Sequence, residues 1–309
     1  VTDGEHVWAF FGTPGLFCYD VTGKKIWQHN FGVFTSEANW GVAASPTLFE
    51  NLIIVNCDND GPKYLPPGRA ESDGAASALV ALDKDSGMVK WSTPRDQGRG
   101  FSTPVLVTGG GRTDLVLNGP LGVWGYDPRS GKELWRCERH PEEENNRFGE
   151  PMPLFSGDVM YAAAGRDRGY LQAIRLGGSG DVTKSGLVWE VRRLGVRDVG
   201  SGVLADDLLL FADSRKSTIS AHDIKTGRQL FDEAPRGVPG ARGTKFYASP
   251  VLLNGKVLCL RQDGVTFVVE PGRELKVVRH NVLNDGTDFS ASPAVADGKL
   301  FLRSQTHLY

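Results

Sequence analysis

The segment Asp127-Pro128-Arg129-Ser130-Gly131, followed by a tryptophan at position 135, indicates a repeat architecture because it recurs along the chain. An Asp side chain can accept hydrogen bonds from backbone N–H groups two or three residues on, and a Gly supplies the positive φ of a tight turn. Apolar residues precede each Asp, and an aromatic residue follows it by eight positions. Each unit therefore predicts a strand, a turn and a second strand. The copies are Asp83, Gly87 and Trp91; Asp127, Gly131 and Trp135; Asp223, Gly227 and Phe231; and, one residue shorter, Asp20, Gly23 and Trp27.

The aromatic residue of each unit is interpreted as structural. A large aromatic side chain buries roughly 150–250 Å², which suits a wedge between neighbouring sheets. Trp189 belongs to the same set of repeat residues. Because these positions are explained by packing, they carry no catalytic assignment.

A second signature precedes each of these units. Ser249-Pro250 and Ser292-Pro293 each open a short apolar strand that ends in Asn-Gly or Asp-Gly and continues into another strand, the pattern of a hairpin with a type I′ turn. Taking positions 45, 103, 152, 201, 249 and 292 as repeat starts gives steps of 58, 49, 49, 48 and 43 residues. A repeat of this length holds about four short strands, as in a propeller blade.

The sequence thus predicts an all-β protein, a β-propeller of four-stranded antiparallel blades. About seven blades are expected within residues 1–309, which form one domain, and the first and last blades are incomplete. We expect the chain to be a fragment cut within blades at both ends, and the parent protein to carry eight blades.

These units resemble the PQQ-like, quinoprotein-type β-propeller repeat proteins. The resemblance is carried by the segments around Asp83, Asp127 and Asp223, while Gly177–Thr183 is similar to an uncharacterised bacterial branch. It implies a periplasmic or secreted protein. Quinone dehydrogenases of this family hold PQQ beside a vicinal cysteine pair and a calcium ion, and use an Asp as base. No such cysteine pair is present here, because the cysteines are Cys18, Cys57, Cys137 and Cys259.

Composition narrows the classes of partner. The net charge is −2, from 35 basic and 37 acidic residues, so the chain has no nucleic-acid footprint. No apolar run approaches the roughly 18–20 residues of a membrane span. The six histidines have no metal-ligand spacing, and the scattered cysteines argue against a disulfide framework or zinc.

Polar residues that follow the second strand of a repeat are the candidate ligand-binding residues. Asp58, Asn59 and Asp60 offer oxygen ligands of the kind calcium takes, or else simply form a polar loop. Arg166 offers a guanidinium to a carboxylate or phosphate, or else belongs to a solvated hairpin. Equivalent positions of successive blades converge at one mouth of a propeller channel. A site there would draw together Asp58, Asn59, Asp60, Asn118, Arg166 and Asp213.

The function expected from these patterns is that of a non-catalytic, monomeric binding or scaffolding module of the bacterial cell envelope. Its partner is a protein or a carbohydrate, and no catalytic residue, metal or cofactor is assigned. The alternative is a quinoprotein-type dehydrogenase, with PQQ and calcium, or another propeller enzyme that uses the axial funnel.

Overall fold

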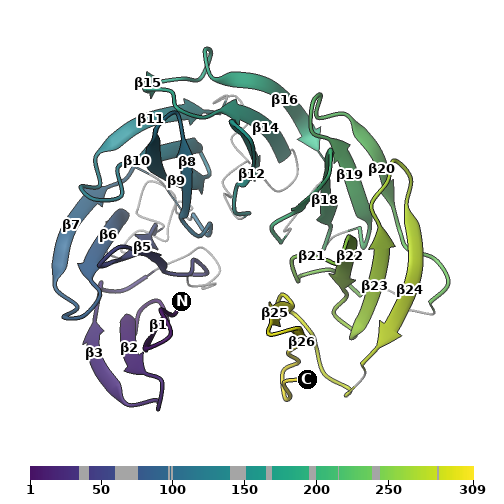
Figure 1. Cartoon of the computed structure of the whole chain (residues 1–309), viewed down its shortest axis with the longest axis horizontal. Coiled ribbons are helices and arrows are strands. Elements are labelled where there is room, and N and C mark those ends of the chain that lie inside the picture. The colour runs from purple at the N-terminus through teal and green to yellow at the C-terminus, as the bar shows by residue number, and fades with distance from the viewer. Residues whose placement is uncertain are drawn as a thin grey trace, which may run out of the picture. The chain divides into compact units, whose positions relative to one another are not determined.

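The computed structural model describes residues 1–34, 42–59, 76–96, 98, 100–139, 151–164, 169–194, 200–214, 216–238, 244–283 and 285–309, without the side chains of residues 193 and 194. Every helix or strand assigned in these ranges is a β-strand, and nearly all strand pairs are antiparallel (Figure 1). The predicted all-β propeller fold is confirmed, whereas the number of blades stays a prediction. A helix able to span a membrane is not found in the described parts of the chain.

The chain divides into two compact units, and unit 1 comprises Val1–Pro153 and Ile174–Leu187. It holds three sheets, in which sheets 1 and 2 follow chain order and sheet 3 gains a fifth strand from a later segment. Sheet 1 is β1 (His6–Phe10), β2 (Leu16–Asp20) and β3 (Lys25–His29); sheet 2 is β4 (Thr47–Phe49), β5 (Leu52–Cys57), β6 (Ala78–Asp83) and β7 (Val89–Pro94); sheet 3 is β8 (Val105–Gly109), β9 (Arg112–Gly119), β10 (Gly122–Tyr126), β11 (Glu133–Glu138) and β15 (Gly180–Asp181).

Unit 2 comprises Leu154–Ala173 and Val188–Tyr309. It holds most of sheet 4 and all of sheets 5, 6 and 7, each in chain order. Sheet 4 is β12 (Leu154–Ser156), β13 (Val159–Ala164), β14 (Gly169–Arg175) and β16 (Leu187–Leu194); sheet 5 is β17 (Val203–Ala205), β18 (Leu208–Ala212), β19 (Ile219–Asp223) and β20 (Gln229–Glu233); sheet 6 is β21 (Val251–Leu253), β22 (Lys256–Leu260), β23 (Val265–Glu270) and β24 (Lys276–Val282); sheet 7 is β25 (Ala294–Ala296) and β26 (Lys299–Phe301).

The turn residues form the hairpins that the sequence predicts. Asn254 and Gly255 have φ angles of 49° and 69°, and Asp297 and Gly298 have φ angles of 49° and 71°. Positive φ at both central residues is the requirement of a type I′ turn, which matches the twist of the strands it joins. The pairs β21–β22 and β25–β26 are therefore tight antiparallel hairpins.

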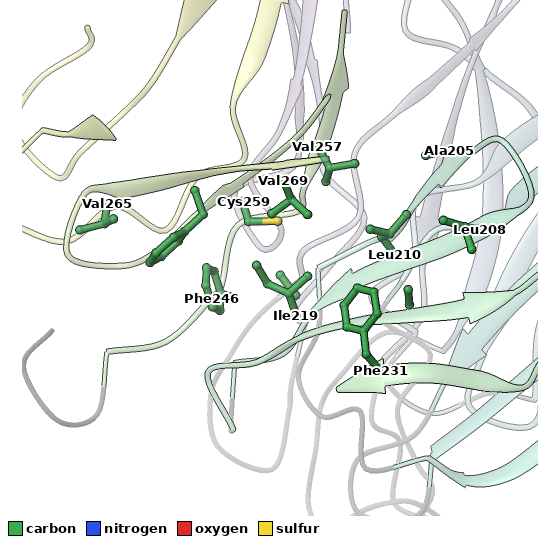
Figure 2. Packing of buried hydrophobic residues seen from close by; sticks show 13 residues of the cluster. Ala205, Leu208, Leu210, Ile219, Phe231, Phe246, Val257, Cys259, Val265 and Val269 are labelled. Atoms are coloured by element: carbon green, nitrogen blue, oxygen red, sulfur yellow. The ribbon is translucent and has the colours of Figure 1, made fainter. Parts of the chain in front are cut away.

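The core lies between successive sheets of each unit. The two middle strands of a sheet are buried on both faces, so β5 is buried along its whole length, whereas the outer strand β7 alternates between half-buried and exposed residues. Between sheets 5 and 6, apolar side chains of both sheets interlock around Leu210, Phe231 and Val257 (Figure 2). Removing apolar surface from water contributes about 25 cal/mol of stabilising free energy per Å², and this burial is the main contribution that holds adjacent sheets together.

Candidate functional site

Three of the repeated tryptophans join one sheet to the next. The indole N–H of Trp27 donates to the Lys84 carbonyl at 3.1 Å, and that of Trp91 donates to the Pro128 carbonyl at 3.2 Å. In unit 2, the Trp189 indole donates to the Ile224 carbonyl at 3.0 Å. In each case the acceptor directly follows the Asp of the next sheet's turn, so one aromatic side chain both fills and orients the interface.

Gly87, Gly131 and Gly227 each lie against the tryptophan of the preceding sheet. Gly131 has a φ of +70°, and a Cβ there would overlap the Trp91 ring and Thr93. Gly227 meets Trp189 in the same way, at 2.6 Å from an added Cβ. The Asp of the turn is held by its own loop: hydrogen bonds from the Ser86 amide and hydroxyl lower the pKa of Asp83 to about 2. Asp, Gly and Trp thus act as one packing unit, in which the Gly is required by both conformation and space.

Sheet 3 departs from this pattern. The Trp135 indole donates to Asp114 Oδ2 at 2.7 Å instead of to a turn carbonyl, and Arg112 Nε binds the other oxygen of Asp114 at 2.7 Å. The segment that would supply the next turn instead forms β15, which pairs in parallel with Trp135 and Arg136 of β11. A buried carboxylate therefore takes the place of the missing carbonyl acceptor.

Asp58, the first candidate ligand, is engaged with an arginine that the sequence did not single out. Arg95 Nε and Nη2 donate to the two carboxylate oxygens of Asp58 at 2.8 and 3.2 Å, and both side chains are almost fully buried. The guanidinium also donates to the Tyr126 hydroxyl and lies 5.8 Å from the centre of the Trp124 ring. Burial raises the pKa of the Asp58 carboxyl and the facing guanidinium opposes that rise, while burial raises the pKa of Tyr126 to about 12.

An asparagine fixes the backbone around this ion pair. Asn56 Oδ1 accepts from the Asp58 amide at 3.1 Å, and Asn56 Nδ2 donates to the Gly100 carbonyl at 2.8 Å. A Cβ on Gly100 would overlap the Asp58 carboxylate. These hydrogen bonds connect the end of β5 to the segment that leads into sheet 3. The side chains of Arg95 and Asp58 are almost completely buried there.

Asn118 on β9 of sheet 3 is the equivalent of Asn56 on β5 of sheet 2. Arg139 Nη2 donates to Asn118 Oδ1 at 2.6 Å, and Asn118 Nδ2 donates to the Pro151 carbonyl at 2.9 Å. Arg95 and Arg139 each follow the wedge tryptophan by four positions. This spacing is the signal from which the two arginines could have been predicted.

The other candidates have different surroundings. Asn59 is buried, exchanges two hydrogen bonds with Ser77 and donates to the Val33 carbonyl at 3.3 Å. In unit 2, Asp213 accepts from the Lys216 amide at 2.9 Å within a turn. Asp60 and Arg166 lie outside the described residues. The predicted convergence of all six residues therefore stays a prediction, and the structure places Asp58 and Asn118 as internal ties of unit 1.

Asp58 is committed to Arg95 and has no free carboxylate oxygen for a calcium ion. Both oxygens of Asp58 bind Arg95, and within the described ranges no group of three His, Cys, Asp or Glu side chains could hold a metal ion. The cysteines are buried separately rather than paired, and burial raises the pKa of Cys18 to about 11 and that of Cys259 to about 12.

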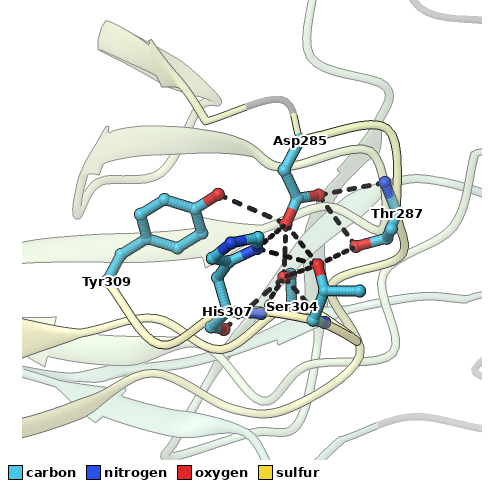
Figure 3. A network of polar contacts seen from close by, with 6 residues as sticks. Asp285, Thr287, Ser304, His307 and Tyr309 are labelled. Atoms are coloured by element: carbon cyan, nitrogen blue, oxygen red, sulfur yellow. Dashed lines mark hydrogen bonds and ion pairs between the residues drawn. The ribbon is translucent and has the colours of Figure 1, made fainter.

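A second polar cluster, in unit 2, was not anticipated from the sequence (Figure 3). The Asp285 carboxylate accepts from Ser304 Oγ at 2.5 Å, Thr306 Oγ1 at 3.1 Å and the Tyr309 hydroxyl at 3.2 Å, and His307 Nδ1 lies 3.4 Å away. These hydrogen bonds, first that from Ser304, hold the pKa of Asp285 far below its usual range. Ser304 donates to a carboxylate rather than to a histidine, so the cluster lacks the base–nucleophile contact of a serine hydrolase. It fastens the segment after β26 to the loop that precedes β25.

The fold and its repeated wedges define a PQQ-like β-propeller protein. The family model described as outer membrane protein assembly factor BamB matches residues 1–233, and the chain belongs to this family. Similarity to solved structures of low identity shows the same fold. A computationally designed protein, Ika8, aligns with a TM-score of 0.64 at 12% identity, over 99% of this chain and 79% of that one.

Two natural proteins give similar alignments. BamB from Moraxella catarrhalis aligns with a TM-score of 0.52 at 13% identity, over 99% of this chain and 96% of that one. Quinohemoprotein alcohol dehydrogenase from Comamonas testosteroni aligns with a TM-score of 0.51 at 13% identity, over 78% of this chain and 43% of that one. No curated protein sequence matches significantly.

Proposed function

We propose that this chain is a non-catalytic scaffold of the bacterial cell envelope that binds a protein partner and takes part in outer-membrane protein assembly. The family match over residues 1–233 supports this role. We place the protein in the periplasm, as a monomer, and favour a protein over a carbohydrate as its partner.

The observation that carries the proposal is the engagement of Asp58. A catalytic acid or base needs a side chain that can reach the substrate. The Asp58 carboxylate instead binds Arg95 through both oxygens and is buried. Its contribution is to fix the ends of strands, from which loops project for binding.

Exposed apolar side chains lie at the same ends of the strands. Leu121, in the turn between β9 and β10, is 43% exposed, and Met152 is 39% exposed. Aliphatic side chains that remain in solvent beside a rigid polar framework are suited to contact with another protein. We propose that the partner contacts this end of sheet 3.

The test is site-specific photo-crosslinking in the source bacterium with a photoreactive residue at Leu121. Met88, 68% exposed in the turn between β6 and β7, is the matched control because that turn lies at the opposite end of the strands. We expect a crosslink from position 121 to an outer-membrane assembly protein, a much weaker one from position 88, and less outer-membrane protein in a deletion strain. Unchanged outer-membrane protein in that strain, or equal crosslinks from both positions, would overturn the proposal.

The dehydrogenase alternative is tested separately. Purified protein is titrated with PQQ and calcium ions while the absorbance of bound cofactor is followed. We expect no saturable change. Saturable binding together with dye reduction on alcohols or sugars would establish the alternative and refute a purely scaffolding role.

A further inference from the structure

A histidine is buried between sheets 4 and 5, at a position where the other repeats have different side chains. His222, on β19, is fully buried, and it pairs across the sheet with Leu209. Its equivalents directly before the turn Asp are Leu82 in sheet 2 and Tyr126 in sheet 3. Leu82 packs within the apolar cluster between sheets 1 and 2, so this position belongs to a sheet interface.

The environment of the imidazole is apolar on the side of sheet 4. Leu209 and Phe211 belong to the cluster that packs against Tyr161, Leu171 and other residues of sheet 4. The ring of Phe211 stands edge-on to the imidazole, with centroids 6.0 Å apart. An imidazolium in this position would lose its hydrating water molecules, and the apolar side chains around it would supply no hydrogen bonds in return. Charging the ring therefore costs free energy.

The hydrogen bonds define the protonation state that fits. His222 Nδ1 lies 3.1 Å from the Gly227 carbonyl, which can only accept, so Nδ1 carries the proton. His222 Nε2 is buried and has no hydrogen-bond partner among the described residues, and the same is true of the Ser220 hydroxyl, two positions away on the same face of β19. A second proton, on Nε2, would thus be a buried donor without an acceptor.

The charged groups near the imidazole do not remove this cost. On β20, Asp232 favours the charged form, but Lys216 Nζ binds its carboxylate at 2.7 Å, and Gln229, directly across from His222, is neutral. Asp223, next in the chain, is held by amides of its own turn and by Arg273. From sheet 4, Trp189 is committed to the Ile224 carbonyl, and Tyr161 lies 5.9 Å from its ring. Burial, the largest effect, lowers the pKa of His222 against the Gly227 carbonyl and Asp232.

We propose that the interface between sheets 4 and 5 is an acid-sensitive latch, which opens when His222 takes up a second proton and releases the Trp189 wedge from the turn at Gly227. The wedge and the latch are one structure, since Gly227 both accepts from His222 and meets Trp189. The unfolded chain binds this proton at the ordinary histidine pKa of about 6.5, and the folded interface binds it less readily. Stability is therefore complete above that pKa and falls as the pH decreases below it.

The test compares the wild-type chain with His222→Leu, the residue found at the equivalent position 82. Hydrogen exchange of the full chain is followed between about pH 7.5 and about pH 5, after correction for intrinsic exchange rates. In the wild type, we expect the opening constant of β16, β19 and β20 to rise by up to about tenfold per pH unit below about pH 6.5. In His222→Leu, we expect this rise to be absent, because no group at position 222 can then take up the proton.

The control and a second measurement keep the outcome decisive. His280→Leu removes an exposed histidine of β24 and should leave the acid response unchanged. If His222→Leu does not fold, the imidazole signals of the wild type are titrated by NMR. An equal acid response in wild type and His222→Leu, or titration of His222 in the folded protein at its ordinary pKa, would overturn the proposal.

Discussion

Two interfaces of the molecule, between sheets 2 and 3 and between sheets 4 and 5, contain the same tryptophan wedge but bury different polar side chains. Trp91 binds the Pro128 carbonyl beside Gly131, and Trp189 binds the Ile224 carbonyl beside Gly227. The first interface adds the Arg95–Asp58 pair, whose two carboxylate oxygens are both hydrogen-bonded. The second adds His222, whose Nε2 lacks a partner among the described residues. Apolar packing is thus shared, whereas the polar groups differ in how completely they are satisfied.

The two interfaces should therefore fail under different conditions. In a buried ion pair, each charge offsets much of the desolvation cost of the other. If one partner is removed, the remaining charge is buried without compensation, and the free energy of unfolding falls. A buried neutral imidazole is stable until it must take a proton. We therefore expect the first interface to be sensitive to mutation and the second to pH.

The largest effect is expected from Arg95→Met. It leaves the Asp58 carboxyl buried without its guanidinium and should lower the free energy of unfolding by about 3–5 kcal/mol. Equilibrium urea unfolding, followed by tryptophan fluorescence, measures the loss. The double variant Asp58→Leu/Arg95→Met should recover most of it, since no buried charge then remains. A single variant as stable as the wild type would show that water already reaches this pair.

A smaller effect is expected from Gly131→Ala. The left-handed conformation alone costs roughly 1–2 kcal/mol for a residue with a Cβ, and the overlap with the Trp91 ring adds to it. Gly23→Ala is the matched control, because its φ is +87° but nothing lies within 4 Å of an added Cβ. The difference in unfolding free energy between the two variants isolates the wedge contact. Equal losses would mean that the turn conformation alone explains the glycine.

The repeat can be predicted from the sequence, but the buried polar contacts that connect its strands cannot. The Asp–Gly turns and the aromatic wedges act over short distances, so Asp127, Gly131 and Trp135 could be placed from spacing alone. Asp58 and Arg95 are 37 positions apart and meet only because sheet 2 brings the ends of β5 and β7 together. Asp285 and Tyr309, 24 positions apart, meet for a similar reason in unit 2. Such pairs depend on tertiary structure, so the sequence pattern predicts Asp58 as a ligand residue without predicting its pairing with Arg95.

The wedge tryptophans themselves differ in a way that Trp→Phe variants would reveal. Trp135→Phe removes a hydrogen bond to the Asp114 carboxylate, and bonds to charged groups contribute about 1.5–3 kcal/mol. Trp91→Phe removes a bond to a neutral carbonyl and should cost about 1 kcal/mol. Urea unfolding of both variants checks the order. The reverse order would mean that Arg112 alone satisfies Asp114.

The smallest effect is expected from the exposed pair of Arg129 and Glu50. Arg129 Nη2 lies 2.5 Å from Glu50 Oε1, a shorter contact than any between Arg95 and Asp58, but the two side chains are 63% and 49% exposed. Water screens this attraction, so a double-mutant cycle with Arg129→Met and Glu50→Gln should give a coupling below about 1 kcal/mol that fades with added salt. The same cycle on Arg95 and Asp58 should give a larger coupling that salt barely changes. A similar, salt-sensitive coupling for both pairs would mean that burial does not distinguish the interface between sheets 2 and 3, and the contrast with the latch at His222 would then lose its physical basis.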